Sequence, residues 1–448
     1  MRTGLALVAW VALVGCGAPS VGPRSTYSFG EAASARQACT FKAGTLPGLS
    51  LAKDARIGVQ LPIDTIVVIM MENRSTDHLL GNFKAMQPDA DIAPLDATNP
   101  DTNGTPIGRY HMDEYCFDDP NHGWNEVHGE WNNGAMDGFV KFNYQNNGAP
   151  ADGRRAMGYY TEADIPFIYA LASTFSFADR SFCSLLGPTF PNRAYMQAGT
   201  SYGLVGGTLF KDAMLNVIDI LEGGKVTWHD YYAKLPTLAT FFSSFAPFID
   251  NALPMATFFD DAAAGKLAQV NWVDPELGDD FGAVRDDFHP PGVVQLGDQY
   301  LEKTIKALMA SPQWPHMAII VTFDEHGGLY DHVPPPPACP PDGIEPVIGA
   351  GDTAGHFDRL GVRVPTIVIS PYAKPHHVSH DVYDHTSILR FIESRFGLPA
   401  MTARDANADP FYDMFDFDHP ALLQPPSLPT VVIDEAKKDA CNTRYPPP

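Results

Sequence analysis

Two pairs of oxygen-bearing side chains each follow a strongly apolar segment of the sequence. Asp324-Glu325 comes after the run 316–323, and Glu72-Asn73 comes after the run 64–71. Both runs are short and rich in β-branched residues, which is typical of buried strands. Carboxylate and amide oxygens suit a hard divalent cation of any of several kinds. If the two strands are neighbours in one sheet, the sequence predicts a metal site at their carboxyl ends; otherwise these residues simply end strands in turns.

Thr189 lies in a second segment with chemical potential, the turn 187–193. A strand-like run over 175–183 precedes this turn, and a helix is expected from Asn192 onward. Backbone N–H groups at a helix start attract anions, and a metal ion can turn a threonine hydroxyl into a nucleophile. In the simpler alternative Thr189 only caps the helix. Arg193 could bind a phosphate oxygen through its planar fork, or pair with a carboxylate.

The composition is that of a large acidic globular protein. The chain has 448 residues, 45% of them hydrophobic, which is enough for a sizeable core. Its net charge of −23 argues against nucleic-acid binding, because such proteins need a basic face. The same charge argues against attraction to anionic bilayers by bulk electrostatics.

The N-terminal segment has the features of an export signal. Arg2 precedes the apolar run 5–14, which is too short to span a bilayer. The run ends in Leu13-Val14-Gly15-Cys16, which resembles a bacterial lipoprotein cleavage box. The resemblance implies removal of residues 1–15 and lipidation of Cys16; an ordinary signal peptide is the alternative. The Ser/Gly/Pro-rich composition that follows predicts a flexible tether over 16–37. We expect an exported lipoprotein of the cell envelope (of the outer membrane in a Gram-negative cell), or a secreted protein.

Export makes disulfide bonds possible for the five other cysteines. Because their number is odd, at least one must be free or pair between chains, and connectivity cannot be read from the sequence. Cys39 and Cys441 lie near the two ends of the expected mature chain and could link them. Cys183 lies in an apolar segment, so we expect a buried free thiol there.

Strand and helix patterns alternate along the chain, which favours a single α/β domain over residues 38–448 with long loop insertions. Pro365 lies inside the last expected strand, and a proline usually confines a strand to an edge or a bulge. The expected strands are 64–71, 175–183, 316–323 and 362–369; the expected helices are 160–173, 192–200, 292–310 and 384–396; and the expected loops are 84–120, 145–158, 334–357 and 400–448.

Four motifs occur in a defined order along the chain. They are Glu72-Asn73-Arg74-Ser75-x-Asp77-His78, Gly187-Pro188-Thr189-x-Pro191-Asn192-Arg193, Asp324-Glu325-His326-Gly327-Gly328-x-Tyr330-Asp331-His332, and Asp384-His385-Thr386-Ser387. The set resembles the phosphoesterase family of bacterial non-specific phospholipases C and related acid phosphatases, over about 64–396. The resemblance implies an alkaline-phosphatase-like α/β fold, with a central, mostly parallel sheet and helices on both faces. It also implies cleavage of phosphate esters by a hydroxyl nucleophile.

Carried over by motif, the resemblance assigns roles to particular residues. Thr189 would be the nucleophile, and a divalent metal ion would be held by Glu72, Asn73, Asp324 and Glu325. The catalytic histidines would be His122, His289 and His385, and His128 competes with His122 for its role. Arg193 and His128 are further candidates for contact with phosphate or substrate. The chain departs from the family pattern at Thr76, at Leu79-Leu80 and at Phe288, which stands as an insertion before His289.

The expected reaction is a phospholipase C cleavage, which releases diacylglycerol and a phosphorylated head group. In it Thr189 attacks phosphorus, and His122 or His385 protonates the leaving oxygen. The expected partners are a phospholipid or other phosphate ester, and a membrane through the lipid anchor, but no nucleic acid. A broad acid phosphatase and a catalytically silent binding lipoprotein are the alternatives. Four aromatic pairs could line an acyl or choline groove or belong to the core: Tyr159-Tyr160, Tyr231-Tyr232, Phe241-Phe242 and Phe258-Phe259.

Overall fold

An eight-stranded sheet forms the centre of the protein. The computed structural model describes residues 23–144, 153–207, 214–234, 236, 243–277 and 279–446. The strand order is β12-β6-β11-β10-β1-β9-β7-β8, and only β11 runs antiparallel to its neighbours. The bounds are β1 Thr65–Met71, β6 Ser176–Ala178, β7 Trp228–Tyr232, β8 Ala252–Pro254, β9 Val270–Asp274, β10 Met317–Phe323, β11 Thr366–Ile369 and β12 His377–Ser379.

The strands β1 and β10 are parallel neighbours in the middle of this sheet. Their register pairs Thr65 with Met317 at one end and Met71 with Phe323 at the other. Every residue of both strands is buried, as expected for parallel strands whose two faces are covered. The two strands therefore end at the same edge of the sheet, which confirms the condition on which the predicted site depended.

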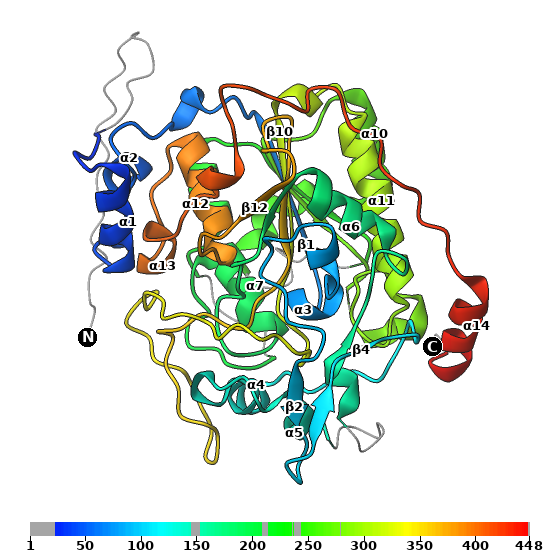
Figure 1. Cartoon of the computed structure of the whole chain (residues 1–448). Coiled ribbons are helices and arrows are strands. Elements are labelled where there is room, and N and C mark those ends of the chain that lie inside the picture. Colours follow the sequence, from blue (N-terminus) through cyan, green and yellow to red (C-terminus); the bar gives the residue numbers. More distant parts are fainter. Residues whose placement is uncertain are drawn as a thin grey trace.

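Helices cover both faces of the sheet (Figure 1). On one side lie α7 (Thr189–Ala198) and α12 (His385–Phe396), which contact each other. On the other side lie α6 (Pro166–Thr174) and α11 (Val294–Met309), with α10 (Met255–Ala264) against α11. The predicted α/β class with a mostly parallel sheet is confirmed.

Several element boundaries differ from the sequence prediction. β6 covers only part of the strand expected over 175–183, and α6 begins at Pro166, a residue that suits the first helical position, rather than at 160. β11 begins after Pro365 and lies inside the sheet, so the expected edge or bulge is wrong. The strands β7, β8 and β9 were not predicted, because segments such as Trp228–Tyr232 mix polar and aromatic residues without a clear period.

Shorter elements occupy the segments between the sheet and its main helices. Some of these shorter elements lie in the segments 84–120 and 400–448, which were expected to be loops. The shorter elements are α1 Phe29–Gln37, α2 Pro47–Ser50, α3 Thr76–Leu79, α4 Trp124–Trp131, α5 Phe139–Phe142, α8 Val217–Gly224, α13 Ala403–Ala406 and α14 Glu435–Arg444, with the strand pairs β2 Thr98–Pro100 with β3 Pro106–Gly108 and β4 Tyr110–His111 with β5 Gly158–Tyr159.

The N-terminal export segment and Cys16 lie outside the described residues. The segment expected to be a flexible tether is helical over its last nine residues, where α1 forms. Ser28 and Glu31 cap this helix, and Arg36 pairs with Asp409 at 2.8 Å, which fixes the helix to the body. Among the described residues, no helix is long and apolar enough to cross a membrane.

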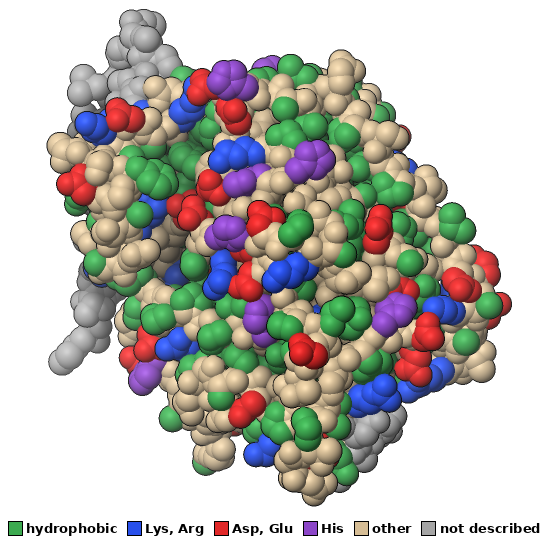
Figure 2. Space-filling model, viewed as in Figure 1, with side chains coloured by type: hydrophobic (Ala, Val, Ile, Leu, Met, Phe, Trp, Pro, Cys, Tyr) green, Lys and Arg blue, Asp and Glu red, His purple; other side chains and the backbone are tan. Residues whose placement is uncertain are grey.

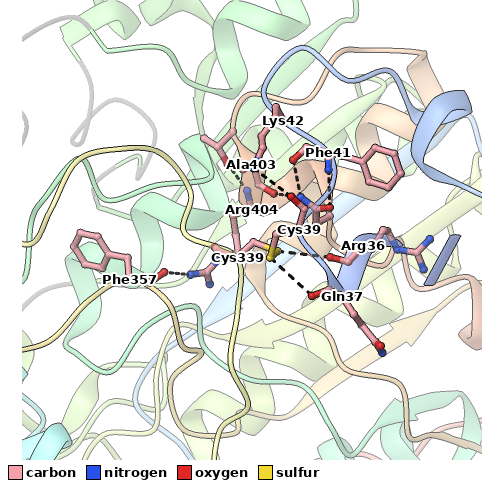
Figure 3. Close-up of a disulfide and its surroundings, with 11 residues drawn as sticks. Arg36, Gln37, Cys39, Phe41, Lys42, Cys339, Phe357, Ala403 and Arg404 are labelled. Atoms are coloured by element: carbon pink, nitrogen blue, oxygen red, sulfur yellow. Dashed lines mark hydrogen bonds between the residues drawn. A yellow bond between two sulfur atoms is a disulfide. The ribbon is translucent and has the colours of Figure 1, made fainter. Parts of the chain in front are cut away.

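Two disulfide bonds fasten the ends of the chain, but not to each other. Cys39 bonds to Cys339 (Figure 3). Cys116 bonds to Cys441, so the expected Cys39–Cys441 link is wrong. Packing decides the pairing, because α1 brings Cys39 beside the loop that carries Cys339, whereas α14 carries Cys441 to Cys116. Cys183 is a buried free thiol, as predicted, and burial raises its pKa.

Candidate active site

The four predicted metal ligands meet at the carboxyl ends of β1 and β10. The backbone N–H of Asn73 donates to Asp324 Oδ1 at 3.1 Å, and that of Arg74 donates to the Glu325 carbonyl at 3.0 Å. Glu72, Asn73, Asp324 and Glu325 are all buried. Gly327 makes this approach possible, because its φ is +65° and a Cβ there would lie 2.6 Å from the Asn73 carbonyl oxygen.

Arg193 joins the two acidic strand ends. Its Nη2 lies 3.1 Å from Glu72 Oε1, and its Nε lies 3.2 Å from Asp324 Oδ2. Arg285 reaches the other oxygen of Glu72 at 3.4 Å and also pairs with Asp287. Of the two roles considered for Arg193, the structure shows pairing with carboxylates, and both of these guanidinium groups partly neutralise the buried acidic cluster.

Thr189 occupies the first position of α7, four residues before Arg193. Residues at this spacing share one helix face, so α7 presents Thr189 one turn ahead of the contact with Glu72 and Asp324. Thr189 is half-buried. Asn192 shapes the preceding turn, because its Nδ2 donates to the Gly187 carbonyl at 2.8 Å and its Oδ1 accepts from two backbone N–H groups.

His122 is the predicted histidine that lies nearest to the acidic cluster. Its Nε2 is 3.3 Å from Asn73 Nδ2 and 3.9 Å from Glu325 Oε1, and its Nδ1–H donates to the Pro120 carbonyl at 2.8 Å. Burial lowers the pKa of His122, but the charges of Glu325 and Asp119 outweigh that effect and raise it to about 10. The neighbouring carboxylates therefore favour the charged form of this ring.

His289 lies beside His122 and is also largely buried. Their ring centroids are 6.0 Å apart, and Asp119 approaches both rings, at 3.9 Å from His122 and 4.0 Å from His289. Burial, with the nearby Arg285 and His122 charges, holds the pKa of His289 well below its usual value. Phe288 has a φ of +73°, and its carbonyl oxygen accepts a hydrogen bond from Arg74. The backbone thus accommodates the apparent insertion through a left-handed conformation at this residue.

The other two predicted histidines lie elsewhere. Both ring nitrogens of His385 face backbone carbonyls, those of Phe323 at 2.9 Å and Asn192 at 3.2 Å, so this ring joins the end of β10 to α7. His128 donates to the Trp124 carbonyl within α4 and lies against the Trp124 ring at 4.2 Å. The structure brings neither ring into contact with the four predicted ligands.

A buried His326 supports Glu325 from behind. Its Nε2–H donates to Glu130 at 2.8 Å, and its Nδ1 lies 3.3 Å from Glu325 Oε2. Burial opposes the charge on this ring, but the bonds to Glu130 and Glu325 raise the pKa of His326 to about 9. Asn143 also donates to Glu130, at 3.0 Å. Such a chain of contacts fixes the orientation of a ligand carboxylate.

The residues present fit a divalent cation. Asn73 Oδ1 and Glu325 Oε1 are buried and have no hydrogen-bond partner among the described residues, although buried oxygens are normally paired. Burial, together with the charge of Glu72, raises the pKa of Asp324 well above its usual value, which indicates excess negative charge. Asp119, His122 and His289 also hold ligand atoms within 4.8 Å of one another and could contribute to a cation site.

Two other features do not belong to this site. A cavity of about 610 Å³ lies beside the Cys39–Cys339 bond and contains none of the predicted site residues. Of the aromatic pairs, Tyr160, Tyr231 and Phe258 are core residues, whereas Phe259 is 39% exposed. Phe241-Phe242 lies outside the described residues.

Several residues of the site received no role from the sequence. Among them are Asp119, Glu130, Arg285 and His326. Asp119 could have been found, because it lies three residues before His122 in one polar segment. Glu130 and Arg285 stand in segments without a distinctive local pattern, and only the tertiary contacts show their connection to Glu325 and Glu72.

Comparison with known proteins identifies the family of this chain. The Phosphoesterase family profile matches residues 63–399. The chain is 32% identical to "Phospholipase C B" of Mycobacterium tuberculosis (strain ATCC 25618 / H37Rv), over 86% of this chain and 85% of that protein. It is 33% identical to "Non-specific phospholipase C1" of Arabidopsis thaliana, over 84% of this chain and 75% of that protein.

Among solved structures, a protein of the alkaline phosphatase superfamily from Vibrio parahaemolyticus aligns over 78% of each chain. Its TM-score is 0.33 and its identity 12%, which is too little to bear on the site. The family match covers about three quarters of the chain and includes every residue of the acidic cluster, Thr189 and the predicted catalytic histidines. The chain therefore belongs to the Phosphoesterase family and is a phosphoric ester hydrolase.

Proposed function

We propose that this protein is a phospholipase C that uses Thr189 as its nucleophile and a bound divalent cation. One structural observation carries the proposal. The helix that begins at Thr189 is joined through Arg193 to Glu72 and Asp324, so the hydroxyl and the acidic cluster belong to one rigid unit. The long matches to proteins named as phospholipases C support the choice of substrate class.

In the proposed reaction the bond from Thr189 Oγ1 to phosphorus forms while the bond from phosphorus to the diacylglycerol oxygen breaks. The Thr189 hydroxyl proton goes to solvent, and the Nε2–H of His122 gives its proton to the leaving oxygen. Water then attacks phosphorus and gives one proton to His122, while the bond from phosphorus to Thr189 Oγ1 breaks and the Thr189 oxygen takes a proton from solvent. His122 is the better donor of the two candidates, because His385 directs both of its nitrogens at carbonyls.

The cation would be held by Glu72, Asn73, Asp324 and Glu325. When bound, it would lower the hydroxyl pKa of Thr189 and neutralise charge on the phosphoryl oxygens. The oxygens of Asn73 and Glu325 that lack hydrogen-bond partners support this assignment. Arg193 Nη1 is buried and has no hydrogen-bond partner among the described residues, so this guanidinium could also bind a phosphoryl oxygen of the substrate.

The substitution Thr189→Ala tests the nucleophile. We expect it to lower turnover of phosphatidylcholine by at least about a thousandfold, because alanine has no hydroxyl to attack phosphorus. Thr189→Ser is the matched control, since it keeps the hydroxyl and should retain much of the activity. Release of diacylglycerol and phosphocholine measures the reaction, and circular dichroism checks the fold. An alanine variant with wild-type turnover would refute the mechanism.

The same assay separates the alternative activities. Turnover of p-nitrophenyl phosphate without turnover of phosphatidylcholine would identify an acid phosphatase instead. Turnover of neither substrate, across pH and added divalent ions, would favour a binding protein without catalysis.

The cell-envelope location is part of the proposal. Lipidation of Cys16 and cleavage before it are supported by the sequence pattern at 13–16. Mass spectrometry of the mature N-terminus would decide between a lipidated cysteine and an ordinary cleaved signal.

A further inference from the structure

We propose that four exposed aliphatic side chains beside the nucleophile form a surface that inserts into a zwitterionic phospholipid bilayer. These residues, here named the apolar rim, are Leu215, Ile344, Val347 and Ile348, with exposed fractions of 50%, 44%, 72% and 39%. Large aliphatic residues that are exposed together mark an interaction surface more often than residues exposed singly. This inference rests on the proposed function and adds to it the way in which the enzyme meets its substrate.

The rim is connected to the nucleophile through packed side chains. Phe190, the residue after Thr189, packs in a small apolar cluster with Ala198, Tyr202 and Met214. The Tyr202 hydroxyl donates to the Leu215 carbonyl. The next residue, Gly203, lies under the side chains of Ile344 and Val347, which a Cβ there would approach to 3.2 and 3.1 Å. The rim is therefore continuous with the apolar residues at the start of α7.

The loop 334–357, which carries most of the rim, is held to the rest of the protein at several points. Cys339 bonds to Cys39, the Val347 N–H donates to the Gly203 carbonyl at 2.8 Å, and the Thr353 N–H donates to Asn125 Oδ1 at 2.7 Å. Figure 1 shows this loop, in yellow, running past α7 and α4. Since α4 begins two residues after His122, the loop lies along the side of the site that holds both Thr189 and His122.

The charges around the rim select the kind of bilayer. Glu345 lies within the rim, is 77% exposed at its side chain and pairs with His356 at 3.0 Å. The whole chain carries −23, so an anionic bilayer would repel it. A surface with no net charge, such as phosphatidylcholine, lets the aliphatic side chains enter the interface without that cost.

The test compares a rim variant with a matched valine elsewhere. The rim variant carries Val347→Ser and Ile348→Ser, and the control carries Val432→Ser, because Val432 is equally exposed, at 79%, in the segment that leads to α14. Binding to phosphatidylcholine vesicles is measured by flotation on chains that also carry Thr189→Ala, to prevent hydrolysis. All proteins carry Cys16→Ser, so that a lipid anchor cannot hold them to the vesicles.

We expect the rim variant to bind vesicles roughly tenfold or more weakly, and the control to bind as the parent does. With Thr189 restored, vesicle hydrolysis should fall by the same factor, while turnover of monomeric short-chain phosphatidylcholine stays within about twofold. Unchanged vesicle binding by the rim variant, or equal loss on both substrates, would overturn the inference. Failure of the parent enzyme on the monomeric substrate would instead count against the proposed function.

Discussion

At the scale of single residues, the site depends on a buried row of three side chains in which a histidine lies between two carboxylates. Glu130, His326 and Glu325 are each fully buried and in contact in that order. Leaving one of such charges unpaired is costly, so the row fixes where the Glu325 oxygens point. The oxygen of Glu325 that has no hydrogen-bond partner lies 3.9 Å from His122 Nε2.

The substitution Glu130→Gln should therefore weaken cation binding, although Glu130 is not itself one of the predicted ligands. We expect cation affinity to fall by about 10–100-fold, because His326 loses the charge that holds it and Glu325 becomes less well oriented. Titration of metal-depleted protein, followed by its thermal stabilisation, measures that affinity apart from activity. Glu126→Gln on the same helix is the control, and equal affinities for the two variants would contradict the positioning role.

Removal of the cation itself is a second residue-scale test. The proposed cation would bind the folded protein more tightly than the unfolded chain, because only the fold brings together the unpartnered oxygens of Asn73 and Glu325. A chelator should therefore abolish turnover and lower the melting temperature, and the competent ion should restore both. Full activity after exhaustive chelation, confirmed by elemental analysis, would exclude the cation from the mechanism.

At the scale of elements, a network of charges ties α3 to the segments after β10 and before β11. Asp77 accepts from the His332 ring at 2.6 Å, and Arg363 pairs with Asp77 and Asp331 at 3.2 and 2.8 Å. Asp91 contacts the other ring nitrogen of His332 at 3.1 Å. These contacts hold together the two motifs that contain the predicted metal ligands. In one motif α3 comes shortly after Glu72 and Asn73, and in the other Asp331 and His332 come shortly after Asp324 and Glu325.

This network predicts how stability depends on pH. Burial lowers the pKa of His332, but its hydrogen bonds to Asp77 and Asp91 outweigh that and raise it to about 9. Because the folded-state pKa lies above the unfolded value of about 6.5, the stabilisation is complete below that value and is lost as pH rises through 9. His332→Gln should thus cost on the order of 1–3 kcal/mol at pH 6 and much less at pH 10.

Chemical denaturation of wild type and His332→Gln at the two pH values measures this difference. His419→Gln is the control, because His419 is 84% exposed in its side chain and should change stability little at either pH. A His332 variant whose loss of stability is the same at pH 6 and pH 10 would show that the ring acts by packing alone.

At the scale of the whole molecule, long-range bonds secure both ends of the chain to the central fold. The disulfides join residues 300 and 325 positions apart, so each closes most of the chain into a loop. On the face seen in Figure 2, acidic, basic and histidine side chains are interspersed with hydrophobic ones. The disulfides add stability because they hold outer segments that bury few side chains of their own, such as α14.

The double substitution Cys116→Ser and Cys441→Ser should lower the free energy of unfolding by about 2–5 kcal/mol. Turnover of a monomeric substrate should persist, because Cys441 lies on α14 and not among the site residues. Differential scanning calorimetry measures the loss, and peptide mapping without reduction checks the pairing. A peptide that joins Cys39 to Cys441 would contradict the structure.

Much of the fold and of the candidate site could be predicted because it is encoded locally. The apolar runs before Glu72 and Asp324 are long and regular enough to be recognised as buried strands, and β1 and β10 agree with them closely. The motif around Thr189 likewise predicted a turn into a helix, although α7 begins at Thr189 rather than Asn192. Short strands such as β8 carry too little pattern to be found this way.

The sequence by itself determined which residue types stand at the two central strand ends, and hence an oxygen-rich site in an α/β protein. Only the tertiary structure decided which distant groups meet there: Arg193 between the carboxylates, Glu130 behind His326, and Asp119 beside both rings. It also decided the cysteine pairing and turned His385 toward backbone carbonyls. The physical reason is that strand patterns arise from neighbours along the chain, whereas pairing of charges and thiols depends on which surfaces pack together.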